Sequence, residues 1–331
     1  MQLNSNTPVT KHNILITTNL DLAKQVLSND GIIAIPTETV YGLAGNTFSE
    51  IAVNKIFALK KRPHYNPLIV HIKSADWLNE VACDIPDAAM LLATKFWPGP
   101  LTLLLNKKPN IPDLVTAGKP TVAVRVPNHP LTLNLLEQLD FPLSAPSANP
   151  FGSISPTSAE HVYNYFEDNL EVILDGGKCN NGVESTIIGF ENNLPVLYRL
   201  GAISLEDIEK VIGEVHTHTK NDKDPSAPGM LSRHYSPNTT TYLADNVVEL
   251  INLYPNKKIG LLLFKDLVGN NPVLHQEILS KNGDLSEAAR NLYAALHRLD
   301  KLNLDIIIAE RLPDNGLGKT INDRLQRAVE K

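Results

Sequence analysis

One stretch of the chain, from Gly31 to Ile72, constrains the fold and the chemistry more than any other. It begins with the apolar run IIAI at 32–35, which is typical of a buried strand. Ser49 is a suitable N-cap for a helix that runs to about Lys60. Positions 51–75 contain no Asp or Glu, yet they carry five Lys or Arg residues, although the formal net charge of the whole chain is -6. Positive charge is therefore concentrated here, which predicts a site for an anion such as phosphate.

Length and composition bound the class of protein. At 331 residues, of which 43% are hydrophobic, the chain is long for one domain and we expect two. Its acidic charge balance argues against a general nucleic-acid coat protein, because such domains are strongly basic. Cys83 and Cys179 lie far apart and predict neither a disulfide nor a zinc site. No apolar signal core opens the sequence, and runs such as 259–264 are too short to span a bilayer, so we expect a cytoplasmic protein without membrane segments.

Apolar patterning predicts an α/β fold. Strands are expected at 32–35, 68–72, 101–105, 121–127, 171–177, 184–190, 195–201, 259–264 and 305–310, and helices at 49–60, 87–96, 130–139, 204–212, 284–299 and near the C-terminus. Hydrophobic periodicity is lost over 216–238, a polar and Pro-rich segment that is poor material for a core and that we interpret as a linker or lid. We therefore predict a catalytic domain over 1–215, this linker, and a small C-terminal α/β domain with parallel strands over 239–331.

The basic cluster at Lys60, Lys61 and Arg62 admits two interpretations. Cations are favoured at a helix C-terminus by the helix dipole, so the cluster fits an ordinary surface feature. Two prolines bracket the following turn, 63–67, and a stiff turn that presents a guanidinium fork favours phosphate binding. Because Arg62 follows a helix in a turn, we expect an alanine there to change stability by no more than ~0.5 kcal/mol.

Other polar residues are weaker signals when taken singly. Arg125 stands inside an apolar strand, where an unpaired guanidinium is unfavourable. His71 alone is more typical of a core histidine, Ser185 of a strand-edge hydroxyl and Arg199 of a surface charge. The small residues of the loop 144–152 allow its backbone to approach a ligand closely, but no Walker A or GxGxxG motif is present. The sequence contains no nucleophile elbow, so it does not predict a hydrolase triad. It also contains no His/Cys spacing typical of a metal site.

Nine segments in order carry a resemblance to a known family. They are PTETVYGL, KKRPHYNPLIVHI, WPGPLTLLL, VAVRVPNHP, SAPSANPFGSISPT, GVESTII, RLGAIS, the linker SAPGMLSRHYSP and the tail GLGKTINDRLQRA. Together they closely resemble the Sua5/YrdC/YciO family, and the last two resemble its longer Sua5 subgroup. The resemblance spans nearly the whole chain, from about Ile14 onward.

The resemblance implies both a fold and an activity. The fold would be a twisted mixed sheet with a large basic cavity, followed by a small Rossmann-like C-terminal domain. The activity would be that of an L-threonylcarbamoyladenylate synthase, which joins L-threonine, bicarbonate and ATP and releases pyrophosphate. A partner complex would then transfer the threonylcarbamoyl group to adenosine 37 of tRNAs that read codons beginning with A. Mg²⁺ is expected with the triphosphate rather than on protein side chains, and any direct binding of tRNA is expected to be weak.

Family contacts can be carried over to matching positions. The resemblance implies that threonine is surrounded by Thr39, His71, Arg125, the backbone at Ala145, and Ser185. It implies that ATP is surrounded by Lys60, Arg62, Asn66, Thr121, Ser147, Asn149, Ser155, Arg199, His234 and Tyr235, with Lys60 and Arg62 stabilising phosphate charge. No residue is expected as a general acid or base. In the linker, His234 and Tyr235 would close over the nucleotide, with Arg233 beside them.

Two rival functions remain open at this point. A basic cavity also fits an RNA-binding module. The small size of the basic region and the negative net charge argue against that interpretation. A nucleotide-binding regulatory protein, with its C-terminal part as a platform for partners, is the third interpretation. Turnover separates both from a synthase.

Overall fold

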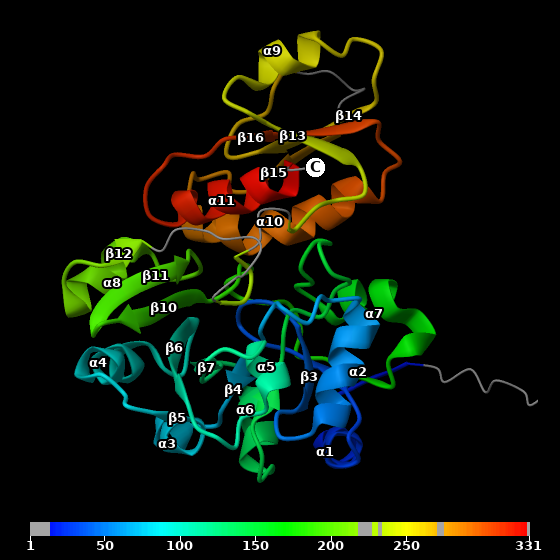
Figure 1. Cartoon of the computed structure of the whole chain (residues 1–331). Helices are drawn as coiled ribbons and strands as arrows, with labels where there is room; N and C mark the ends of the chain where they lie inside the picture. The colour runs from blue at the N-terminus through cyan, green and yellow to red at the C-terminus, as the bar shows by residue number, and fades with distance from the viewer. Residues whose placement is uncertain (1–13, 218–226, 231–233, 270–274, 330–331) are drawn as a thin grey trace, which may run out of the picture.

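The computed structural model describes residues 14–217, 227–230, 234–269 and 275–329. Within these ranges the chain forms two sheets, of twelve and four strands, which follow one another along the sequence (Figure 1). This confirms the predicted α/β class with a mixed sheet and a smaller C-terminal sheet. None of the helices in the described ranges is both long and apolar enough to cross a membrane.

The larger sheet is mixed, in the order β1-β9-β2-β3-β8-β4-β7-β6-β10-β11-β12, with β5 paired to β6. Its strands are β1 (Leu15–Thr17), β2 (Ile33–Ile35), β3 (Gly42–Asn46), β4 (Ile69–His71), β5 (Ala82–Cys83), β6 (Leu101–Lys107), β7 (Thr121–Arg125), β8 (Leu143–Ser144), β9 (Val172–Leu174), β10 (Thr186–Glu191), β11 (Leu194–Arg199) and β12 (His216–Thr217). They include the apolar runs expected as strands between residues 32 and 201. The first two residues of the expected linker, His216 and Thr217, pair with β11 as its parallel neighbour.

Helices pack around this sheet. They are α1 (Leu20–Ser28), α2 (Glu50–Lys60), α3 (Leu78–Val81), α4 (Asp87–Phe96), α5 (Asp113–Thr116), α6 (Pro130–Glu137), α7 (Ala159–Phe166) and α8 (Leu205–Ile212), with short 3₁₀ turns η1 (Ala75–Trp77) and η2 (Glu167–Asn169). The expected N-cap of α2 is confirmed, because the Ser49 side chain accepts a hydrogen bond from the backbone N–H of Ala52. At the other end, Lys61 adopts a left-handed conformation (φ 52°), which ends the helix and turns the chain toward Arg62.

The smaller sheet is entirely parallel, in the order β13-β16-β14-β15. Its elements are β13 (Thr240–Ala244), α9 (Val247–Asn252), β14 (Ile259–Leu263), β15 (His275–Ile278), α10 (Leu285–Asp300), β16 (Ile306–Glu310) and α11 (Leu317–Val329). Asp284 caps α10 as expected, accepting from the N–H groups of Ser286 and Glu287. Figure 1 shows α9 on the outer face of this sheet and α10 and α11 between the sheet and the rest of the molecule.

The core of the smaller sheet extends into the larger part of the chain. Residues of α10 and α11 such as Leu292 and Leu325 pack in one apolar cluster with Val40, Ile154 and Val183. The two sheets are therefore joined by apolar contact as well as by the chain.

Candidate active site

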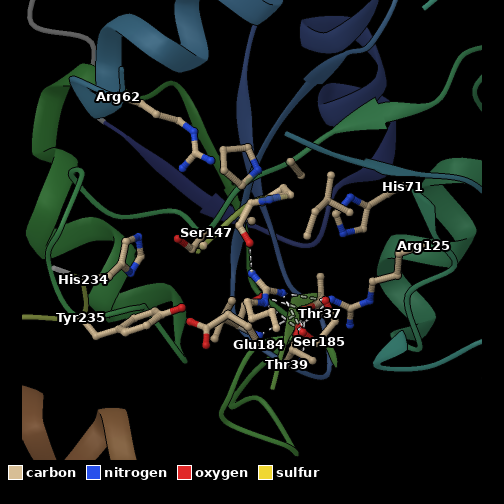
Figure 2. Close-up of a pocket in the computed structure, with 18 residues that line it drawn as sticks. Thr37, Thr39, Arg62, His71, Arg125, Ser147, Glu184, Ser185, His234 and Tyr235 are labelled. Atoms are coloured by element: carbon tan, nitrogen blue, oxygen red, sulfur yellow. Dashed lines mark hydrogen bonds between the residues drawn. The ribbon is translucent and has the colours of Figure 1, made fainter. Parts of the chain in front are cut away.

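A small cavity lies where the larger sheet meets the linker (Figure 2). Its volume is about 50 Å³, whereas pockets that hold small molecules usually measure about 300–1,000 Å³. The large basic cavity implied by the family resemblance is therefore not shown. The lining residues are Thr37, Thr39, Val40, Gly42, Arg62, Ile69, His71, Arg125, Ala145, Pro146, Ser147, Glu184, Ser185, Arg199, Pro228, Gly229, His234 and Tyr235.

Strand pairing places two predicted residues side by side on one wall. Strands β4 and β7 run parallel, with His71 directly opposite Arg125, so both side chains project from the same face of the sheet. His71 is 3% exposed, and its Nδ1 has no hydrogen-bond partner. Burial, and secondly the charge of Arg125, lower the pKa of His71 to about 3, so its imidazole is neutral at pH 7.

Arg125 has a protein partner that the sequence interpretation missed. Its Nη2 lies 2.7 Å from Oε1 of Glu38, its Nη1 donates to Thr39 Oγ1 (2.9 Å), and its Nε donates to the carbonyl of Gly99 (3.2 Å). The N–H bonds of Nη2 do not point at the carboxylate oxygen, so both atoms keep hydrogen-bonding capacity although they are buried. Glu38 is the one carboxylate in PTETVYGL, directly after a buried strand, and that placement was the signal available to find it.

The other residues predicted to surround threonine also line the cavity. Thr39 and Thr37 share a hydrogen bond between their hydroxyls (2.8 Å), and Ser185 shares one with Thr102 (2.7 Å). The backbone N–H of Ala145 donates to Ile69 (2.9 Å), so this N–H is not free to bind a ligand. The five predicted threonine residues are thus brought together, around one arginine and several hydroxyls.

The residues predicted to surround ATP divide into two groups. Arg62, Ser147, Arg199, His234 and Tyr235 line the cavity, whereas Lys60, Asn66, Thr121, Asn149 and Ser155 do not. Thr121 begins β7, four residues from Arg125, and lines a separate surface depression roughly 13 Å further along the strand. Asn149 donates to the carbonyls of Pro150 and Ser153 and so shapes its own loop.

Arg62 is buried, which contradicts the expectation that it lies on the surface. It is 6% exposed, and it donates to the carbonyls of Asn66 (3.1 Å) and Pro67 (2.7 Å) and to the side-chain oxygen of Asn66 (2.7 Å). Burial, followed by the neighbouring charge of Arg199, lowers the pKa of Arg62 to about 9, so it remains a cation at pH 7.

Lys60 is directed at the loop 144–152 rather than at the cavity. Its Nζ donates to the carbonyls of Ser147 and Asn149, both at 2.5 Å. Burial and the charge of Arg62 lower its pKa well below the ordinary value. In this structure Lys60 therefore fixes the loop that carries Ser147.

Arg199 joins the floor of the cavity to the linker. It donates through Nε and Nη2 to the carbonyl of Ser185 and through Nη1 to the carbonyl of Pro228 (3.1 Å). Gly229 fits against it closely, since a Cβ there would lie 2.8 Å from Arg199 Nη1. Three guanidinium groups and one carboxylate, that of Glu184, therefore line the cavity, which leaves the lining with an excess of positive charge.

Part of the linker is packed against the site. His234 and Tyr235 are 6% and 1% exposed, whereas Arg233 lies outside the described residues. Ala227 and Met230 are also buried, in an apolar cluster with Ile69 and Leu104 of the sheet. The expectation that this segment is poor material for a core is wrong at these positions, because isolated apolar residues can anchor a segment that has no periodicity.

Comparison with known proteins decides the family. A family model named Sua5/YciO/YrdC, described as telomere recombination, matches residues 25–201. The chain belongs to the Sua5/YciO/YrdC family. A second model, described as the C-terminal domain of threonylcarbamoyl-AMP synthase, matches residues 203–329, so this member has the long Sua5 form.

Relatives of this family member are similar over nearly their whole length. A protein of Pyrococcus abyssi named threonylcarbamoyl-AMP synthase is 42% identical over 90% of each chain, and one of Bacillus subtilis with the same name is 39% identical over 93% of this chain and 92% of its own. The crystal structure of P. abyssi Sua5 complexed with L-threonine superposes with a TM-score of 0.88 at 41% identity, over 94% of each chain. The similarity therefore covers both sheets of the chain.

Proposed function

We propose that this protein is an L-threonylcarbamoyladenylate synthase, which converts L-threonine, bicarbonate and ATP into threonylcarbamoyl-AMP and pyrophosphate. One observation carries the proposal: a single cavity has Arg125 and His71 on one side and Arg62 and the linker on the other (Figure 2). Such an arrangement suits two substrates that must react together and that each carry an anionic group, the carboxylate of threonine and the phosphates of ATP. The names of the relatives and the threonine complex of the P. abyssi protein support the same assignment.

At the threonine end, Arg125 and the hydroxyls set the orientation of the amino acid. The carboxylate is expected to reach Nη2 of Arg125, and Glu38 limits how much charge is left uncompensated when the site is empty. Neutral His71 is too weak a base to take the proton of an ammonium group, so its expected role is to orient the amine through the free Nδ1. Hydrogen bonds from Thr39 and Ser185 would complete the contacts.

The chemistry then needs positioning rather than a covalent enzyme intermediate. The ammonium group of threonine first loses a proton to solvent. The free amine then attacks the carbon of bicarbonate, with loss of water, to give a carbamate. A carbamate oxygen then attacks the α-phosphorus of ATP, and the bond from phosphorus to the leaving pyrophosphate oxygen breaks. Arg62, still charged at pH 7, can stabilise the developing negative charge on the phosphates.

Mg²⁺ is expected to arrive with the triphosphate. The described ranges contain no group of three or more His, Cys, Asp or Glu side chains that could hold a metal ion. Glu184, which lines the cavity, and Glu38, which lies beside Arg125, are both paired with arginine. These residues do not make a protein site for Mg²⁺, so the phosphates themselves would supply its ligands.

Entry of ATP requires the cavity to widen. A space of about 50 Å³ holds a few water molecules but no nucleotide, and the linker residues Pro228, Gly229, His234 and Tyr235 form one of its walls. The linker is therefore proposed to act as a lid that opens for ATP and closes during the reaction. The division into a catalytic domain (1–215), a lid (216–238) and a C-terminal domain (239–331) remains a prediction.

Pyrophosphate release tests the function. Release from ATP is expected only when L-threonine and bicarbonate are both present, and chelation of Mg²⁺ should stop it. Serine, which lacks one methyl group, should react about 10–200-fold more slowly in terms of kcat/KM. Release that is independent of threonine, or equal with glycine, would exclude this substrate assignment.

The RNA-binding alternative is weakened by burial. Arg62, Arg125 and Arg199 are only 3–6% exposed, so they cannot contact the backbone of a duplex in this conformation. Transfer of the product to adenosine 37 of tRNA by a partner complex, and weak direct binding of tRNA, remain proposals. A salt-dependent affinity for tRNA without any pyrophosphate release would favour the RNA-binding module.

A further inference from the structure

The last helix, α11, buries polar side chains where an amphipathic helix would bury apolar ones. Thr320, Asn322, Arg324 and Arg327 are all between 0% and 6% exposed. Burying a guanidinium is unfavourable unless it is paired and hydrogen-bonded. The helix carries most of the tail motif GLGKTINDRLQRA, whose role the proposed reaction leaves unexplained.

Arg324 reaches from this helix to the wall of the cavity. Its Nε donates to Oε2 of Glu184 at 2.8 Å, and its Nη2 donates to the carbonyl of Leu200 at 2.5 Å. Its guanidinium carbon lies 5.0 Å from the ring centre of Tyr235, within the range of a cation–π contact. Glu184 and Tyr235 both line the cavity, and Leu200 directly follows Arg199, which also lines it.

A second residue of the C-terminal part acts on the same two groups. The hydroxyl of Tyr293, on α10, donates to the carboxylate of Glu184 (2.9 and 3.1 Å to its two oxygens). The ring of Tyr293 stacks on Tyr235 with 5.6 Å between ring centres. From the larger part of the chain, Ser155 donates to Oε1 of Glu184 (2.7 Å), the carboxylate oxygen that Arg324 does not bind. Glu184 and Tyr235 are therefore both held by α10 and α11.

Glu184 stays ionised within this network. Burial alone would raise its pKa, but the charges of Arg324 and Arg199 and the hydrogen bond from Ser155 outweigh burial and hold the pKa at about 2. A buried ion pair is often no more stabilising than apolar residues of similar volume, so stability is a weak reason for placing one here. Both ends of this pair touch groups that line the cavity, which points to a role in the site.

We propose that Arg324 is a positioning residue of the active site: it fixes Glu184 and the ring of Tyr235, so that the linker closes on the nucleotide in one geometry. This inference rests on the proposed function. The C-terminal part then completes the nucleotide side of the cavity without touching substrate. Figure 2 shows Tyr235 and His234 on the side away from His71 and Arg125, so threonine binding should be affected much less.

Arg324→Met tests the proposal, with Arg298→Met as its matched control. Arg298 also pairs with a glutamate, Glu277, through two hydrogen bonds (2.7 and 2.8 Å), but this pair is on the surface and away from the cavity. Loss of the charged contacts of Arg324 should raise the KM for ATP about 10- to 100-fold and leave the KM for threonine within about twofold. Limited proteolysis of the ligand-free protein should cut the linker faster in Arg324→Met than in wild type, and Arg298→Met should match wild type in both measurements.

Two further variants keep the test open if Arg324→Met does not fold. Arg324→Lys keeps the charge but cannot reach Glu184 and Leu200 together, so it should restore thermal stability but only part of the ATP affinity. Tyr293→Phe removes one hydroxyl and keeps the ring, so a smaller rise in the KM for ATP is expected. If these variants lose thermal stability but keep the wild-type KM for ATP and the wild-type rate of linker cleavage, Arg324 is only a structural residue. Absence of pyrophosphate release by the wild-type protein would instead overturn the proposed function.

Discussion

Lys60 and Arg62 are separated by one residue, yet they have different neighbours. Lys60 ends α2 and points at the loop 144–152, whereas the left-handed turn at Lys61 sends Arg62 toward the cavity. Both were expected to bind phosphate. In this structure Arg62 lines the cavity, and Lys60 holds the backbone that forms another part of it.

Arg62→Ala should reduce both turnover and stability. The substitution leaves the carbonyls of Asn66 and Pro67 and the Asn66 side chain without their donor, which costs on the order of 1–3 kcal/mol of unfolding free energy. Loss of the charge should also lower kcat/KM by about 10- to 100-fold. Urea unfolding and pyrophosphate release would measure the two effects, with the exposed Arg298→Met as control. Wild-type kinetics in the alanine variant would remove Arg62 from the site.

The sequence indicated individual site residues better than it indicated their partners. The family resemblance, rather than any local pattern, predicted the residues around threonine, and the structure places them along one cavity. His71 and Arg125 lie opposite each other there because β4 and β7 pair. The partners of the buried charges were missed, since Glu38 lies 87 positions from Arg125, and Glu184 140 positions from Arg324. Contacts over such separations depend on the complete fold and leave no local pattern.

Elements with strong apolar patterns were predicted well, and short ones were not. The runs that form β6, β7, β10 and β14 bury most of their residues, so composition alone indicates them. Strands such as β3 (GLAGN) and β8 (two residues) were missed. Their residues have weak strand preference, and pairing with neighbouring strands fixes their conformation instead.

Met230 is one large apolar anchor among the described residues of the linker, which makes the linker testable as an element. Met230 is 1% exposed and packs with Ile69, Leu104 and Ile187 of the sheet. Met230→Ala should weaken this attachment and raise the rate of linker proteolysis by about 30-fold or more, because buried Met→Ala changes usually cost about 2–5 kcal/mol. Thermal stability should fall less, since local detachment exposes far less surface than global unfolding.

Met90→Ala is the matched control, because Met90 lies on α4 and is 42% exposed. It should leave linker cleavage unchanged. ATP together with threonine should slow cleavage of the wild-type linker if the segment closes over the substrates. Equal cleavage rates in both methionine variants would show that Met230 does not hold the linker.

At the scale of the whole molecule, two histidines meet where α10 packs against the larger part. His161 on α7 and His297 on α10 stack with 3.9 Å between ring centres, and His297 Nε2 lies 3.2 Å from the carbonyl of Ser155. Burial is the main cause that lowers the pKa of His161 to about 3 and that of His297 to about 4. Both rings are therefore neutral in the folded protein at pH 7.

Acidification should destabilise the molecule through this pair. The unfolded chain binds protons near pH 6.5 and the folded protein only near pH 3–4, so the stability contributed by neutral histidines is complete above about pH 6.5 and is lost as pH falls. Between pH 6.5 and pH 5 the loss is roughly 2 kcal/mol for each histidine. Urea unfolding at pH 7, 6 and 5 would measure it. His297→Gln, which keeps a donor for Ser155, should flatten the pH dependence, and an unchanged slope would contradict this origin.

The apolar cluster that joins the two sheets also bears on the order of folding. Val40, Ile154 and Val183 come from the first part of the chain, yet they are buried against α10 and α11 from its last part. Contacts between such distant positions form late, because the chain entropy of closing long loops must be overcome first. The cavity borders these same segments through Glu184 and Tyr235. Competence to bind substrates should therefore be among the last properties that a refolding chain acquires, well after most of its helices and strands have formed.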